Sequence, residues 1–150
     1  MKRVLLSLMV LLLGGVAAFA QRGLNCYPVF QGEVVPARQM VSTEVRGSGM
    51  AVYRLDYYRG VQFQVGSGLA GQVARLVEAD AAAAGVAETE RVGEFLTYAL
   101  FQPKGKRRTN RYVCYQARPA GDGWKVTLLY LEGPATLEDL RTMFEKQYRQ

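Results

Sequence analysis

The chain has 150 residues and a mass of 16.6 kDa; 49% of its residues are hydrophobic, 21% are charged, and its formal net charge at pH 7 is +6. A chain of this length and composition can bury a core and form one domain, which excludes a low-complexity polymer. Histidine is absent, so the commonest general base and the commonest zinc ligand are both excluded.

The N-terminus has the pattern of a secretory signal peptide. Lys2 and Arg3 precede an almost uninterrupted apolar run, residues 4–20, which closes with the small residues of Ala18-Phe19-Ala20. The run is short for a bilayer span, which takes about 20 apolar residues, whereas its small-residue end suits a signal peptidase. We therefore expect cleavage after Ala20, export to the periplasm or the cell exterior, and no transmembrane helix in the mature chain. A retained membrane anchor is the alternative.

Residues 21–150 are expected to form a single domain that begins with an irregular lead-in, residues 21–37. Gly and Pro recur through this lead-in, and we expect one short helical turn around residues 27–30, with apolar side chains docked on the body of the domain. The residues from Gln39 to Arg46 then suit a strand, and Gly47-Ser48-Gly49 has the backbone freedom that a chain reversal needs.

A second strand is expected from Val52 to Val65, because apolar and polar residues alternate through it. Successive side chains of a strand point to opposite faces, so one face of this strand should be buried and the other wet. The side predicted to be buried consists of Tyr53, Leu55, Tyr57, Val61, Phe63 and Val65.

A helix is expected next, from Gly68 to Ala84, where apolar residues recur at helical spacing. Ser67 is its predicted N-cap, and Gly85 follows its end. Three more strands are expected at residues 88–101, 111–118 and 124–131, joined by two loops that are short enough for antiparallel hairpins.

The C-terminal segment predicts a second helix. Gly133-Pro134 ends the last strand, and Thr136 can cap the helix while Asp139 reaches back to it. The element order is therefore ββαβββα. This order predicts an α+β fold, with an antiparallel sheet of about five strands and two helices packed on one face.

Two stretches in the second half of the chain carry a family resemblance. They are residues 110–115, NRYVCY, and residues 126–144, VTLLYLEGPATLEDLRTMF. In them the chain resembles a family of small exported proteins of Bacteroides-type bacteria, known as a domain of unknown function, and the likeness extends over about residues 24–147. The resemblance implies an exported, single-domain protein of the cell envelope, and it brings no active site with it.

Cys26 and Cys114 are the two cysteines of the sequence. The compartment outside the cytoplasmic membrane permits oxidation, so they are a candidate disulfide. The alternative is a pair of buried, inert thiols, because cysteine also packs as a small hydrophobic residue. A nucleophilic cysteine is disfavoured, since there is no histidine to lower a thiol pKa.

The densest cluster of like charges lies in the basic loop, residues 104–111, and consists of Lys104, Lys106, Arg107, Arg108 and Arg111. Such a cluster could bind the phosphates of lipopolysaccharide or an anionic membrane surface, and this binding would weaken steeply with salt. The simpler interpretation is a solvated hairpin tip whose charges discourage edge pairing. Nucleic acid is not expected, because the loop has no aromatic residues on which bases could stack.

Little in the sequence favours catalysis. Glu88, Glu90 and Glu94 alternate along a predicted strand and could bring two carboxylates to one bond, but solvent-facing glutamates on strands are ordinary. Metal-ligand spacing, a nucleophile elbow and a phosphate-binding loop are not found in the sequence. We therefore expect a non-enzymatic binding or structural module of the cell envelope that uses no cofactor. Its partner would be an envelope protein or an anionic surface, and the alternatives are polyanion binding through the basic loop and an extracytoplasmic enzyme or enzyme inhibitor.

Overall fold

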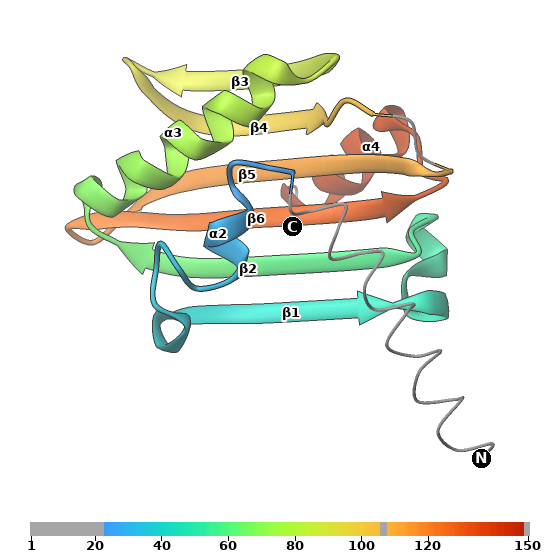
Figure 1. Cartoon of the computed structure of the whole chain (residues 1–150), viewed down its shortest axis with the longest axis horizontal. Coiled ribbons are helices and arrows are strands. Elements are labelled where there is room, and N and C mark those ends of the chain that lie inside the picture. Colours follow the sequence, from blue (N-terminus) through green and yellow to red (C-terminus); the bar gives the residue numbers. More distant parts are fainter. Residues whose placement is uncertain (1–22, 106–107, 149–150) are drawn as a thin grey trace.

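The structure, a computed structural model, describes residues 23–105 and 108–148. It contains a six-stranded sheet in the order β1-β2-β6-β5-β4-β3, in which every neighbouring pair of strands is antiparallel (Figure 1). The predicted signal peptide, residues 1–20, lies outside the described residues. Among those that are described, no helix is both long enough and apolar enough to cross a bilayer.

The chain combines strands that follow one another directly with separate helices, as the α+β prediction requires. The first half comprises α2 (Tyr27–Phe30), the 3-10 helix η1 (Ala37–Gln39), β1 (Met40–Arg46), the 3-10 helix η2 (Gly47–Tyr53), β2 (Tyr57–Val65) and α3 (Ser67–Ala83). The second half comprises β3 (Val86–Val92), β4 (Phe95–Gln102), β5 (Asn110–Ala120), β6 (Gly123–Gly133) and α4 (Leu137–Tyr148). The α+β class and the antiparallel sheet are therefore confirmed.

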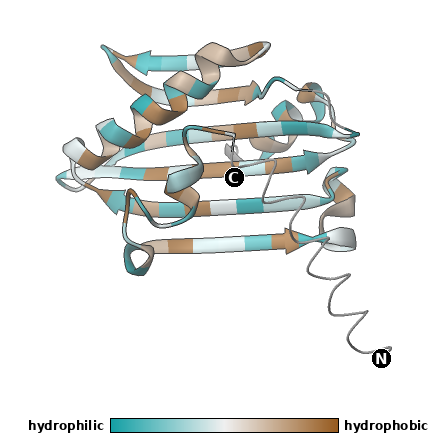
Figure 2. Ribbon diagram, in the orientation of Figure 1, coloured by the Kyte–Doolittle hydropathy of each residue, from teal (hydrophilic) through white to brown (hydrophobic). Residues whose placement is uncertain are grey.

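One face of the sheet is covered by α3, which runs across it diagonally (Figure 1). Hydrophobic and hydrophilic residues alternate along this helix (Figure 2), as expected for an amphipathic helix. Its apolar side packs into the larger core cluster with residues of β2, β4, β5 and β6. The lead-in docks on the same cluster, as predicted, through Cys26, Val29, Phe30 and Val35.

The opposite face of the sheet is covered by α4, so the prediction of both helices on one face is wrong. Leu140 and Phe144 of this helix belong to a second, smaller core cluster. Alternation along β5 sends Val113 into the α3 cluster and Tyr112 into the α4 cluster. A strand that buries side chains on both faces needs a layer on each side, and the central residues of β5 are buried without interruption.

The sixth strand arises from a hairpin inside the predicted strand 88–101. Gly93-Glu94 turns the chain between the paired residues Val92 and Phe95. Gly93 has a φ of +60°, and glycine at the first position of a two-residue loop is typical of a type II′ turn. The sheet therefore has six strands rather than about five, and the order of elements differs from the predicted one.

The predicted strand 52–65 is also shorter than expected, because η2 occupies its start. Arg54 follows η2 with a φ of 58°, in the left-handed region, which interrupts the alternation of side chains. Leu55 consequently joins the α4 cluster, and Tyr53 is exposed. The residues that share the α3 face as predicted are Tyr57, Val61, Phe63 and Val65.

The two long helices differ in how well their starts were predicted. Ser67 is the first residue of α3 and Gly66 is its N-cap, without a side-chain bond, so the predicted Ser67 cap is wrong. The cap of α4 is confirmed: the Asp139 N–H donates to Thr136 Oγ1 at 3.1 Å, and the Thr136 N–H donates to Asp139 Oδ2 at 2.8 Å. This reciprocal pair fixes where α4 begins.

Candidate functional site

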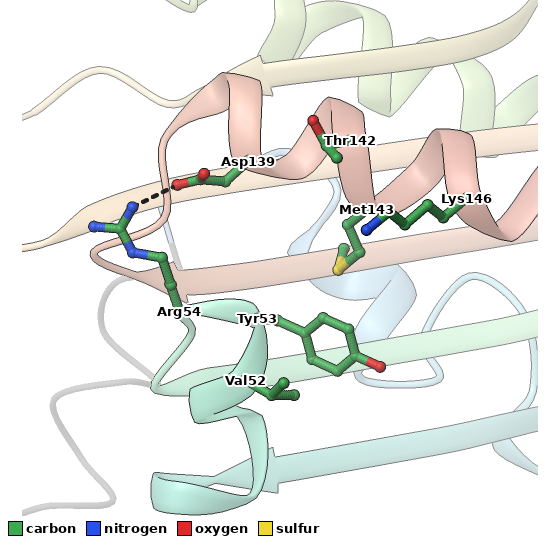
Figure 3. Close-up of a pocket in the computed structure, with 7 residues that line it drawn as sticks. All are labelled: Val52, Tyr53, Arg54, Asp139, Thr142, Met143 and Lys146. Atoms are coloured by element: carbon green, nitrogen blue, oxygen red, sulfur yellow. Dashed lines mark hydrogen bonds and ion pairs between the residues drawn. The ribbon is translucent and has the colours of Figure 1, made fainter.

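A cleft with a volume of about 430 Å³ lies between η2 and α4 (Figure 3). Two of its lining residues are large apolar side chains that remain in solvent: Val52 is 82% exposed and Tyr53 is 44% exposed. Apolar side chains grouped in the open beside a cavity are typical of a binding surface. The remaining lining residues are Arg54 at the end of η2 and, on α4, Asp139, Thr142, Met143 and Lys146.

Hydrogen bonds to the main chain of Ala135, just before α4, tie this segment to the Arg54 wall of the cleft and to β5. The Ala135 N–H donates to the Arg54 carbonyl at 2.9 Å. The Ala135 carbonyl accepts from the Tyr112 hydroxyl at 2.7 Å and from Asn110 Nδ2 at 3.0 Å. A Cβ added at Gly133 would lie 2.6 Å from the Arg54 carbonyl oxygen, so this close approach requires glycine.

An ion pair closes one end of the cleft. Arg54 Nη1 lies 3.1 Å from Asp139 Oδ2, and the two side chains are 59% and 35% exposed, so the pair adds little to stability. Hydrogen bonds from the main chain and side chain of Thr136 lower the pKa of Asp139, and the Arg54 charge lowers it further. Arg54 and Asp139 therefore balance each other's charge.

The other end of the cleft is cationic. Lys146 lies on the exposed side of α4, and among the described residues no carboxylate forms an ion pair with it. Met143 lies between the two ends, where its flexible thioether side chain can adapt to different shapes (Figure 3). The cleft thus combines an apolar wall with one unbalanced positive charge, which suits a ligand that has an apolar part and an anionic group.

The sequence prediction missed this cleft. Val52 and Tyr53 were assigned to a strand, and Asp139 was recognised only as a cap. The available signal was the run from Met50 to Tyr53, in which apolar residues follow one another without the alternation seen further on. That run indicates a break in the strand, but the contact with α4 depends on tertiary structure.

The predicted glutamate cluster is only partly assembled. Glu88 and Glu90 line a second cavity of about 540 Å³ between α4 and the β3–β4 hairpin. Arg141 forms ion pairs with both Glu88 and Glu138. Glu94 lies in the β3–β4 turn, away from this cavity. Among the described residues, no three cysteine or carboxylate side chains converge in a way that could hold a metal ion.

The structure places the positive charges of the basic loop in different environments. Lys104 and Arg108 are exposed, whereas Arg111 is only 7% exposed. Arg111 Nη2 donates to the Lys104 carbonyl at 2.8 Å, so this side chain supports the base of the loop. Lys106 and Arg107 lie outside the described residues. The charge of Arg111 is therefore not presented on the loop surface with those of Lys104 and Arg108.

The sheet separates the two cysteines. Cys26 belongs to the α3 cluster and Cys114 to the α4 cluster, and both are free thiols. Burial raises the pKa of both, that of Cys114 to about 12, and the nearby Asp80 carboxylate raises the pKa of Cys26 further. This placement favours the alternative of two buried thiols over the disulfide, since a bridge would have to pass through the sheet.

The comparisons with known proteins point to one family. No curated protein and no solved structure matches the chain. A family model matches residues 13–144, a range that contains all six strands, α3, the start of α4 and both stretches of the resemblance noted above. The chain therefore belongs to DUF6108, a family of unknown function.

Proposed function

We propose that this protein is an exported, non-enzymatic binding module of the cell envelope, which binds a small amphipathic anion in the cleft between η2 and α4. The observation that carries the proposal is the exposure of Val52 and Tyr53 beside the Lys146 ammonium. Covering apolar surface contributes about 25 cal/mol per Å². An aromatic or aliphatic group would cover the two side chains, while Lys146 and the Thr142 hydroxyl would hold the anionic group.

Export is supported by the sequence of the N-terminal segment. Lys2 and Arg3 followed by an apolar run and Ala18-Phe19-Ala20 form the three parts that a signal peptide needs. A domain that works outside the cytoplasm meets envelope lipids, glycans and their fragments. Many of these molecules combine an apolar part with a negative charge, which is the chemistry that the cleft suits.

Titration with anilinonaphthalene sulfonate, a fluorescent aromatic anion, tests the apolar wall. We expect saturable binding by the purified protein, and a loss of affinity of about tenfold or more in Val52→Asp, which corresponds to about 1.4 kcal/mol. Val92→Asp is the matched control. Val92 is also an exposed valine, with 68% of its surface in solvent, and it lies in the β3–β4 hairpin, outside the cleft. Equal affinities in the two variants would rule out the cleft as the site.

The charged end of the cleft is tested in the same titration. We expect Lys146→Gln to weaken binding of the sulfonate several-fold at low salt, because it removes the unbalanced cation. Lys125→Gln, on an exposed position of β6, removes the same charge at a distance from the cleft and should leave the affinity unchanged. If both lysine variants lose affinity equally, the effect comes from net charge and not from the cleft.

A second candidate function is polyanion binding through the basic loop. It is supported by the exposure of Lys104 and Arg108 at the tip of the hairpin between β4 and β5. With Arg111 turned inward, fewer charges than the sequence indicated are presented there. The cleft is therefore the better-supported site.

A further inference from the structure

β1 forms an exposed edge of the sheet. It is the terminal strand on its side, and five of its seven residues are exposed. Its pairing with β2 runs from Met40 to Arg46 without a bulge, and it contains no proline. Such an edge presents a row of main-chain donors and acceptors to any strand that fits beside it.

The opposite edge, β3, is tied to both long helices, whereas the ion pair on β1 joins two residues of that same strand. The pairing of β3 with β4 contains an irregularity between Glu90 and Arg91. Arg91 is tied to Glu78 of α3, and Glu88 is tied to Arg141 of α4. Bulges and charged side chains that are held in place hinder the approach of another strand. Among the described residues, no helix holds the outer side of β1 in this way (Figure 1).

The hydrogen bonds to β2 reveal which groups of β1 point outward. The Gly47 N–H donates to the Asp56 carbonyl at 2.8 Å, one step beyond the Arg46–Tyr57 pair. Bonded and non-bonded pairs alternate in an antiparallel ladder, so Val45, Thr43 and Val41 are the residues bonded to β2. The N–H and C=O groups of Ser42 and Glu44 therefore point away from the sheet.

We propose that β1 pairs antiparallel with β1 of a second copy of this chain, about a two-fold axis at Thr43. The two six-stranded sheets then continue into each other. Ser42 of each copy exchanges main-chain hydrogen bonds with Glu44 of the other, and Thr43 lies opposite Thr43. Val41, which is 69% exposed, is covered by Val45 of the second copy. An isologous contact of this kind closes on itself and does not propagate into a fibre.

The side chains favour this register over its neighbours. Cross-strand pairs of β-branched residues stabilise a sheet, whereas like charges directly opposite destabilise it. In the proposed register the directly opposed pairs are Val41 with Val45, Thr43 with Thr43, Ser42 with Glu44, and Met40 with Arg46. A shift by two residues in either direction shortens the paired segment, and in one direction it also sets Glu44 opposite Glu44.

The contact is small, so the association should be weak. Interfaces that bury less than about 1,200 Å² in total belong to transient complexes, and one pair of seven-residue strands falls in that class. Dimerisation should therefore depend on concentration over the micromolar range. The pairing lies outside the cleft and does not rest on the proposed function. The sulfonate titration tests only the cleft, and the experiments below test only the pairing of β1.

Cysteine cross-linking tests the register. In Thr43→Cys the two new thiols lie on a non-bonded pair with Cα atoms about 4.5 Å apart, within the range for a disulfide. Mild oxidation of the purified protein should therefore give a covalent dimer. Val41→Cys is the control, because its two introduced thiols would be about 13 Å apart along the strands and cannot bridge. Equal yields of dimer from the two variants, or none from Thr43→Cys, would overturn the proposal.

Sedimentation equilibrium tests the hydrogen bonds of the edge. Ser42→Pro removes an outward N–H and should shift the protein to monomer, whereas Ser42→Ala keeps the N–H and should dimerise as the wild type does. Circular dichroism establishes that both variants are folded. A wild-type protein that is monomeric at every concentration, or a Ser42→Pro variant that dimerises normally, would contradict the pairing.

Discussion

Asp80 is the residue that ties the lead-in to the body of the domain. It is 6% exposed on α3, and its carboxylate accepts from the Asn25 N–H at 2.7 Å, Asn25 Nδ2 at 3.0 Å and the Cys26 N–H at 2.8 Å. Hydrogen bonds to a buried charged group stabilise more than neutral ones do. The carboxylate therefore holds Cys26 and the turn that follows it against the core.

We predict that Asp80→Asn lowers the free energy of unfolding by about 2 kcal/mol, because an amide turns a donor toward main-chain N–H groups that need an acceptor. Urea unfolding measures this change. Glu78→Gln is the matched control, since it makes the same exchange on the same helix at a more exposed side chain that pairs with Arg91. A loss of stability in Glu78→Gln as large as that in Asp80→Asn would contradict the role given to Asp80.

Sequence alone could indicate that Asp80 is special, but not what it binds. It falls three residues after Val77, on the apolar stripe of a predicted helix, where a carboxylate needs a buried partner. Its partners lie 55 and 54 residues earlier in the chain. Helical spacing predicts which side of a helix is buried; it does not predict which distant segment donates to it.

The buried thiol of Cys114 should make the protein less stable at alkaline pH. Burial raises the pKa of its thiol from 9.0 to about 12. A thiol whose pKa is higher in the folded than in the unfolded protein makes its full contribution to stability when the pH is below the unfolded-state pKa. This contribution is lost as the pH rises through the folded-state pKa. The free energy of unfolding should therefore fall between pH 9.0 and about 12.

Urea unfolding at several alkaline pH values checks this prediction. Cys114→Ala should show a shallower decline, because it removes the thiol that must ionise. Some slope should remain, since burial also raises the pKa of Tyr115 and Tyr130 above their ordinary value. A decline of equal steepness in Cys114→Ala and the wild type would assign the alkaline limit to other groups.

At the scale of elements, hydrophobic alternation predicted the middle of each strand better than its ends. β5 and β6 lie where the sequence places them, with short extensions at both ends. The break at Gly93 was missed because the residues on both sides of it, Val92 and Phe95, favour strands. A two-residue turn takes up so little sequence that the glycine was its main signal.

The same limit explains why the cleft was not foreseen. Residues 47–49 were assigned to a chain reversal because of their glycines, and a strand was predicted from Val52 because apolar and polar residues alternate after it. In the structure residues 47–53 form η2, which Arg54 ends in a left-handed conformation that costs a non-glycine residue about 1–2 kcal/mol. Contacts with the α4 region hold this conformation, and contacts of that kind cannot be derived from local preferences.

The basic loop allows a direct test of polyanion binding. Reversal of Lys106, Arg107 and Arg108 to Glu should abolish salt-sensitive retention on a polyanion column if the loop is a binding surface. Arg111→Gln should instead lower stability and leave retention nearly unchanged, because Arg111 is buried and bonded to the Lys104 carbonyl. Unchanged retention of the triple variant would count against polyanion binding.

For the whole molecule, the decisive prediction concerns processing. The protein recovered from an envelope fraction should begin at Gln21, and intact-mass measurement checks this. Ala20→Leu should leave the precursor uncleaved, because the residue before the cut must be small, whereas Ala17→Leu changes a position where size is not restricted. Recovery of the full-length wild-type chain from the cytosol would contradict export.

The strand order determines when the sheet can be completed as the chain is synthesised. β6 is synthesised last of the six strands yet lies between β2 and β5, in the middle of the sheet. Until it emerges from the ribosome, β1 and β2 form an isolated two-stranded hairpin, which has little stability in water. The six-stranded sheet therefore cannot close before β6 has been made, and β1 and β2 are the last part of it to find their place.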